Sequence, residues 1–105
     1  MDIADWRKQI DEMDRKLVEL INQRARAAQE IGRLKRNTSM PVYEPDREKQ
    51  IFENIFRMNQ GPLSNHMLQQ VYERLIDVMR KIQIVDQPPE NRAVGDTELE
   101  ADVND

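Results

Sequence analysis

The chain has 105 residues, the size of one small domain. Its apolar fraction is low at 38%, but charges of both signs are mixed along it, which favours solvated helix faces over a disordered polyelectrolyte. The net charge of -4 argues against nucleic acid as a partner, because binding phosphates needs a concentrated basic surface. With no cysteine and a single histidine, the sequence excludes disulfides, thiol nucleophiles and metal sites built from cysteine or clustered histidine.

The sequence predicts no membrane segment and no secretory leader. The first residues, MDIADWRKQ, carry charges of both signs, whereas a secretory leader begins with a basic segment that is followed by an apolar one. No stretch approaches the roughly 18 apolar residues of a membrane span. We therefore expect a cytoplasmic protein that does not associate with membranes.

Residues 4–36 predict one long helix, because they contain no proline and their apolar residues recur at helical spacing. These apolar residues are Trp6, Ile10, Met13, Leu17, Leu20, Ile21, Ala28 and Ile31. Asp2 or Asp5 is suited to cap the start of the helix. About 30 residues at 1.5 Å each make a helix of roughly 45 Å, too long for the rest of so short a chain to cover. This length predicts a coiled coil or a helical dimer.

Two shorter helices are predicted after a break at residues 37–44, NTSMPVYE, which are rich in turn formers. The second helix is expected from Pro45, a residue that suits the first helical position, to about Asn59. The third helix is expected to be capped by Ser64 and to run to about Val85. The sequence thus predicts an all-α fold of three helices, long, short and medium in chain order.

Residues 87–105 differ from the rest of the chain. They are acidic and lack aromatic side chains, which predicts a disordered tail. The folded domain is therefore expected to comprise residues 1–86.

Two cations lie within the apolar stripe of the first helix. On a helical wheel with Leu17 at zero, Arg24 falls at about -20° and Lys35 at about 0°. A buried cation is costly unless an anion meets it, so this placement suggests an anion-binding site. Arg7, at about 80°, lies at the edge of the stripe and points elsewhere. The alternative interpretation is structural: the two cations pair with Glu44 or Glu48, or they reach solvent at a helix end.

The second helix repeats the pattern of charges beside apolar residues. With Ile51 at zero, Glu44 projects to about 20° and Arg47 to about -40°. Glu48 follows at about 60°. Here too there is a structural alternative, because acids often gather in a first turn to complement the helix dipole, and either glutamate can pair with a cation of the first helix. Gln83 lies on the flank of the third helix, where its amide is either a hydrogen-bond donor or part of the surface.

Together these residues suggest a pocket between helices that holds several cations, two carboxylates and an amide. The sequence contains no candidate pair of nucleophile and base, no metal-binding set and no glycine-rich phosphate loop. Such a pocket suits a small polyanion better than hydrolytic chemistry.

The sequence resembles the all-helical chorismate mutases over about residues 5–85. Three segments carry the resemblance: WRKQIDEMDRKLVELINQRARAAQEIGRLKR, PVYEPDREKQIFENI and LIDVMRKIQ. The most specific parts are a pattern in the first helix and a P–x–R–E run at Pro45–Glu48. The first-helix pattern consists of Ile10–Asp14, Leu17, Leu20, Arg24, Ile31, Gly32 and Lys35.

The resemblance implies an intertwined homodimer in which the long helices pair. The implied reaction is the rearrangement of chorismate to prephenate, a pericyclic step of the shikimate pathway toward phenylalanine and tyrosine. It needs no nucleophile, proton transfer, metal or cofactor, because an ether C–O bond breaks while a C–C bond forms in the same molecule. The resemblance also leaves room for association with another enzyme of that pathway.

The resemblance assigns the cations and the amide to the substrate. Arg7, supplied by the other subunit, and Arg24 are expected to hold the two carboxylates through forked hydrogen bonds. Lys35 and Gln83 are expected to donate hydrogen bonds to the ether oxygen, where negative charge grows in the transition state.

The remaining site residues lie in the second and third helices. Glu48, helped by Glu44, is expected to orient the hydroxyl group of the substrate, and Arg47 to support the acids and the charge balance. Glu44 stands where many relatives have aspartate. Met79 is a departure, because many relatives carry at this position a serine that helps to hold a carboxylate.

The sequence is also compatible with three alternative functions. An isochorismate pyruvate lyase shares the fold and the cationic pocket, but typically has an apolar residue at the position of Glu48. A non-catalytic helical dimer that senses or regulates would have a vestigial pocket, for which Met79 is the only support. A plain coiled-coil module gives no reason for Glu44, Arg47 and Glu48.

Overall fold

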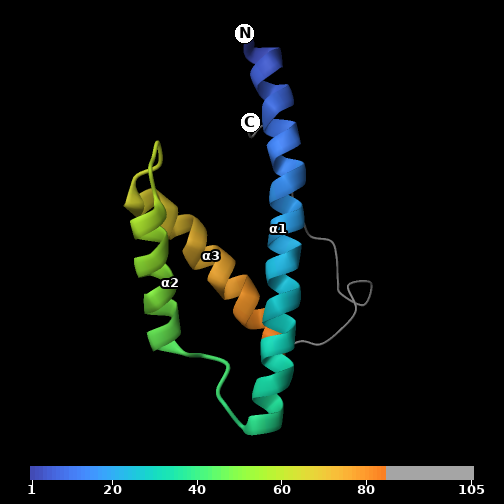
Figure 1. The fold of residues 1–105 in the computed structure, drawn as a ribbon, viewed down its shortest axis with the longest axis vertical. Coiled ribbons are helices and arrows are strands. Elements are labelled where there is room, and N and C mark those ends of the chain that lie inside the picture. The colour runs from blue at the N-terminus through green and yellow to red at the C-terminus, as the bar shows by residue number, and fades with distance from the viewer. Residues whose placement is uncertain (85–105) are drawn as a thin grey trace. The chain divides into compact units, whose positions relative to one another are not determined.

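The computed structural model describes residues 1–84, in which the chain forms three helices and no strand (Figure 1). The helices are α1 (Ile3–Thr38), α2 (Pro45–Met58) and α3 (Asn65–Ile84). The predicted all-α fold is confirmed for these residues, and each boundary lies within two residues of its expected place. The expected tail at residues 87–105 lies outside the described residues. The chain divides into two compact units, residues 1–26 and, in its described part, residues 27–84.

The first unit is the N-terminal part of α1, and its start is capped by two aspartates. The Asp5 backbone N–H donates to Asp2 Oδ1 at 2.9 Å, and the Asp2 N–H donates to Asp5 Oδ2 at 3.1 Å. This reciprocal pair satisfies two of the N–H groups that a helix start leaves without a partner. Both aspartates therefore take part in capping the helix, whereas the sequence predicted that either Asp2 or Asp5 would do so.

An apolar stripe on the first unit is open to solvent in this chain. None of residues 1–26 is buried. The exposed large apolar side chains are Met1, Ile3, Trp6, Met13, Leu17, Val18, Leu20 and Ile21. A monomer rarely leaves so many large apolar side chains along one element in contact with water.

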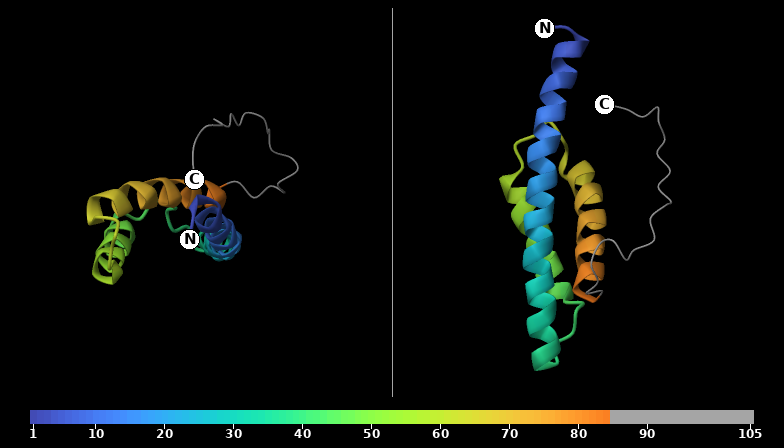
Figure 2. Two further views of the ribbon diagram at one scale, coloured as in Figure 1. Left: turned by 90° about the horizontal axis from the view of Figure 1, so that it is seen from above. Right: turned by 90° about the vertical axis from the view of Figure 1, so that its right-hand side faces the viewer.

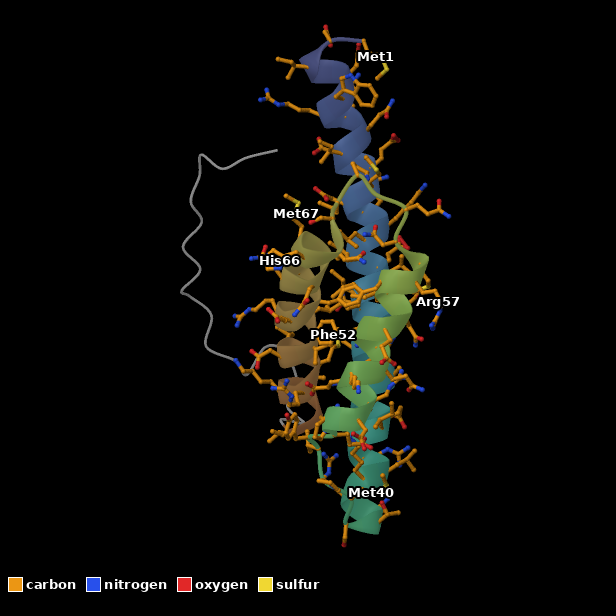
Figure 3. All side chains as sticks on the ribbon, turned by 90° about the vertical axis from the view of Figure 1, so that its left-hand side faces the viewer. Met1, Met40, Phe52, Arg57, His66 and Met67 are labelled. Atoms are coloured by element: carbon orange, nitrogen blue, oxygen red, sulfur yellow. The ribbon has the colours of Figure 1, made fainter. Side chains whose placement is uncertain are left out.

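The second unit consists of the end of α1 together with α2 and α3. Helices α2 and α3 are antiparallel neighbours (Figures 1 and 2). Phe52 lies on the side of α2 that faces α3, whereas Arg57 points away from it (Figure 3). The ring centroids of Phe52 and Phe56 are 6.2 Å apart, within the range of favourable aromatic pairs. The buried apolar side chains of this unit are Ala28, Ile55, Ile76 and Met79.

The helix boundaries follow from local chemistry. Helix α1 ends at a left-handed residue, Ser39, with φ of 62°, and the Met40 N–H donates to the Lys35 carbonyl at 3.1 Å. This is the hydrogen bond of a Schellman turn, which reverses the chain directly after the helix. Pro45 opens α2, and the Ser64 hydroxyl accepts the Met67 N–H at 3.1 Å at the start of α3, so both sequence predictions are confirmed.

Candidate functional site

The site is built around Lys35, which is 6% exposed and lies in the last turn of α1. Its Nζ atom meets three acceptors: the Val42 carbonyl at 3.0 Å, Gln83 Oε1 at 3.1 Å and Glu44 Oε1 at 2.7 Å. An ammonium group has three N–H donors, so every donor of Lys35 has a partner. This explains how a lysine can be buried in the second unit, because a buried charge needs both an opposite charge and hydrogen bonds.

Gln83 is held against α1 by its main chain as well as by its side chain. A Cβ at Gly32 would lie 2.8 Å from the Gln83 carbonyl oxygen and 2.9 Å from its Cα. Only glycine therefore permits this approach of α3 to α1 without a shift of backbone. The Gln83 carbonyl also accepts a hydrogen bond from Arg36 Nη1 at 2.9 Å. With Oε1 directed at Lys35, the Gln83 amide NH2 group remains as a donor.

Glu44 reaches Lys35 because its side chain has no capping task. Glu44 is the N-cap residue of α2, yet it makes no side-chain cap hydrogen bond. Its carboxylate is directed to Lys35 instead, while its carbonyl accepts the Glu48 N–H at 3.1 Å. The structural alternative from the sequence, a pair between Lys35 and Glu44 or Glu48, is thus present in this structure, with Glu44 as the partner. Such a pair leaves the ammonium in place for a ligand that replaces one of its acceptors.

Glu48 is joined to α3 by a forked ion pair. Arg80 donates from Nε to Glu48 Oε2 at 2.9 Å and from Nη2 to Glu48 Oε1 at 3.2 Å. Arg80 Nη1 contacts Asp77 Oδ1 at 3.3 Å, and its guanidinium lies 5.4 Å from the centroid of the Tyr43 ring. The hydrogen bond to Glu48 raises the pKa of Arg80 above its ordinary value, which favours the charged form of the pair.

Four other predicted site residues lie elsewhere in the two units. Arg47 is exposed and donates to Gln50 Oε1 at 2.6 Å. Met79 is 4% exposed and belongs to the apolar core of the second unit. Arg7 is exposed and Arg24 is half-buried, and both belong to the first unit.

The cluster suits binding and electrostatic stabilisation. Its groups are ammonium, guanidinium, amide and carboxylate side chains, all held by hydrogen bonds. Within residues 1–84 no three His, Cys, Asp or Glu side chains gather in a way that would hold a metal ion. In the same part of the chain, no helix is long and apolar enough to cross a membrane.

Comparison with known families decides the family of the chain. A family model described as chorismate mutase type II matches residues 6–84, which include the whole of this cluster. The chain belongs to the chorismate mutase type II family.

Several relatives are similar in sequence. The chain is 34% identical over 79 residues to the bifunctional chorismate mutase/prephenate dehydratase of Aquifex aeolicus. The matched region covers 71% of this chain and 22% of that protein. It is 36% identical over 56 residues to the chorismate mutase of Methanocaldococcus jannaschii. Here the matched region covers 53% of this chain and 57% of the relative. The chain therefore spans about a fifth of the length of the bifunctional relatives that it matches.

The fold is also that of solved chorismate mutases. A structure of the enzyme from Thermus thermophilus has a TM-score of 0.77 and 27% identity, over 78% of this chain and 93% of that one. The enzyme from Helicobacter pylori, solved in complex with prephenate, has a TM-score of 0.72 and 27% identity, over 78% of this chain and 89% of that one.

Seen within this family, the cluster contains groups that the sequence analysis did not assign. Arg80 and Tyr43 were missed, as was the Val42 carbonyl that accepts from Lys35. Arg80 lies three residues before Gln83, a spacing that places both on neighbouring parts of the α3 surface. This spacing could have indicated from the sequence that Arg80 belongs to the site. The Val42 carbonyl left no signal, because any residue type supplies a backbone oxygen.

Proposed function

We propose that this chain is a chorismate mutase, which rearranges chorismate to prephenate. The observation that carries the proposal is the buried Lys35 ammonium, held beside the Gln83 amide in a member of the chorismate mutase type II family. In the reaction the ether C–O bond breaks while a C–C bond forms, and negative charge grows on the ether oxygen. Donors fixed at that oxygen stabilise the transition state more than the ground state.

Lys35 and Gln83 act as those two donors. All three N–H groups of Lys35 are occupied, so the ether oxygen takes the place of one acceptor. Of the two side-chain acceptors of Lys35, Gln83 Oε1 is uncharged and the Glu44 carboxylate is charged. Replacing Gln83 Oε1 by the ether oxygen therefore costs less free energy than separating Lys35 from Glu44. The Gln83 amide NH2 group then donates to the same oxygen. The dry surroundings of Lys35 strengthen its effect on the developing charge.

The rest of the site holds the substrate in its compact reactive conformer, which removes much of the entropic barrier. Glu48, helped by Glu44, accepts a hydrogen bond from the substrate hydroxyl. Arg24 holds one carboxylate and Arg47 contributes to the positive balance of charge. Met79 supplies no hydrogen bond where many relatives have serine, so the carboxylates depend more on the arginines.

A homodimer supplies the last arginine, Arg7, from the second copy. The uncovered apolar stripe of residues 1–26 supports this arrangement, because pairing two first helices would remove it from water. The proposed domain, residues 1–86, includes the whole region that the family model matches.

Cellular context forms part of the proposal. We place the protein in the cytoplasm, where the small anionic substrate is expected. Relatives that join a chorismate mutase to a prephenate dehydratase support association with another enzyme of the shikimate pathway.

The proposal is tested by incubating the purified chain with chorismate and following the loss of the diene absorbance, with prephenate identified as the product. Isochorismate is supplied in a parallel reaction, with salicylate and pyruvate as the products to detect. Prephenate from chorismate, at a rate well above the uncatalysed reaction, supports the mutase. Salicylate and pyruvate without prephenate would identify a lyase, and no product from either substrate would leave a non-catalytic dimer.

A further inference from the structure

Arg80 is a cation of the cluster that forms a forked ion pair, and the proposed reaction gives it no task. We infer that Arg80 is a positioning residue, which fixes Glu48 as a hydroxyl acceptor and neutralises its charge so that a dicarboxylate can bind. This inference rests on the proposed function. It assigns Arg80 an action on the substrate through Glu48, without contact of its own.

The geometry of the pair supports orientation of Glu48. The two hydrogen bonds, 2.9 Å from Nε and 3.2 Å from Nη2, engage both carboxylate oxygens and fix the plane of the carboxylate. Each oxygen has two lone pairs, and the fork uses one on each. Glu48 therefore keeps one lone pair on each oxygen for a substrate hydroxyl.

Arg80 itself is held on two further sides. Tyr43 lies against its guanidinium, with 5.4 Å from Arg80 Cζ to the ring centroid, and Asp77 accepts from Nη1 at 3.3 Å. Asp77 shares its charge with Arg74 and Lys81, both at 3.3 Å, whereas the contacts of Arg80 to Glu48 are shorter. A planar guanidinium that lies over a ring and is forked to a carboxylate loses little further freedom when substrate binds.

The charges of the cluster explain why a neutralising partner is needed. Glu44 and Glu48 are two anions in a site that we propose for a dianion, and each would repel it if left alone. Glu44 is compensated by Lys35 at 2.7 Å, and Glu48 by Arg80. With both acids paired, the remaining arginines supply a net positive charge for the two carboxylates.

The test measures kcat and KM for chorismate in the full chain with Arg80→Leu, Glu48→Gln and the double variant, with folding checked by circular dichroism and thermal unfolding. Arg80→Leu is expected to lower kcat/KM on the order of 100-fold, because Glu48 loses its position. Its KM rises further than that of Glu48→Gln, because an uncompensated carboxylate now faces the dianion. In the double variant KM returns to within about twofold of the Glu48→Gln value, because the repelling charge is gone.

A matched control is Arg74→Leu, which removes another α3 arginine that contacts Asp77 and has no contact with Glu48. This variant is expected to keep the parental kcat and KM. Arg80→Lys keeps the charge but not the fork, so it should lower kcat/KM less than leucine does and keep KM near the parental value. It also serves as the informative variant if Arg80→Leu does not fold.

The outcomes separate this inference from the proposed function. If the parental chain does not turn over chorismate, both are overturned. If the parental chain turns over chorismate but Arg80→Leu and Arg74→Leu have equal effects, the inference on Arg80 is wrong while the function stands. The same conclusion follows if the KM of the double variant is no lower than that of Arg80→Leu alone. A merely structural tie between α2 and α3 predicts no recovery of KM.

Discussion

At the scale of single residues, the site depends on complete satisfaction of one buried charge. Lys35 has three donors and three acceptors from three parts of the second unit: the chain after α1, the start of α2 and the end of α3. Each acceptor also fixes Lys35, so the ammonium has a single position before any ligand binds. Such preorganised donors stabilise developing charge without reorganisation during the reaction.

Gly32→Ala tests how closely α1 and α3 must approach. In an open helix position this change raises stability by up to about 1 kcal/mol. Here the new methyl group would meet Gln83 backbone atoms at 2.8 and 2.9 Å, so we expect a loss of about 1–3 kcal/mol from overpacking. Displacement of Gln83 from Lys35 should also lower kcat/KM on the order of 100-fold. Urea unfolding and steady-state kinetics measure both effects, and a stabilised, fully active variant would show that the approach is not required.

At the scale of helices, most of the fold could be predicted from local signals. The apolar spacing of residues 4–36 indicates a helix, and Pro45 and Ser64 mark where the next two helices begin. These signals depend only on residues within one or two turns, so they can be recognised in the sequence. The wheel angle placed Lys35 within the apolar stripe, and Lys35 is buried, although Leu17 at the same angle is exposed. The forked pair between Glu48 and Arg80 could not be predicted, because it joins side chains 32 positions apart and depends on how α2 meets α3.

The end of α1 is set by a serine in a conformation that favours glycine. Ser39 has φ of 62°, where an L side chain is strained. Ser39→Gly should therefore raise the free energy of unfolding by about 0.5–1 kcal/mol, with activity retained because the turn keeps its geometry. Chemical denaturation measures the change. An unchanged or lower stability would mean that the serine conformation carries no strain.

The start of α1 should respond to acid. The backbone N–H of Asp5 lowers the pKa of Asp2 below its ordinary value of 3.8, so the cap stabilises the helix above that pH. This contribution is lost as the pH falls through the lowered pKa of Asp2. NMR titration of the Asp2 carboxyl and the Asp5 amide should give one shared midpoint below 3.8. Asp2→Asn should remove the titration of the Asp5 amide at that midpoint, and a midpoint at or above 3.8 would contradict the cap.

At the scale of the whole molecule, the proposed dimer makes a prediction that a monomer cannot imitate. Arg7→Ala and Arg24→Ala should each be inactive, because each empties one carboxylate contact in every site. Mixed and allowed to exchange subunits, they should recover about a quarter of the parental activity, since half of the dimers are hybrids and each hybrid holds one intact site of two. Activity assays before and after mixing measure this, and no recovery would show that Arg7 is not supplied by the second copy.

The central claim, a mutase that works through the Lys35 ammonium, is tested most directly by measuring prephenate formation in the parental chain and in Lys35→Ala. The exposed Lys49 of α2 provides a matched control, Lys49→Ala. We predict prephenate from the parental chain and from the control, and a loss of at least about 100-fold, or roughly 3 kcal/mol of transition-state stabilisation, in Lys35→Ala. A folded Lys35→Ala variant that forms prephenate at the parental rate would contradict the claim.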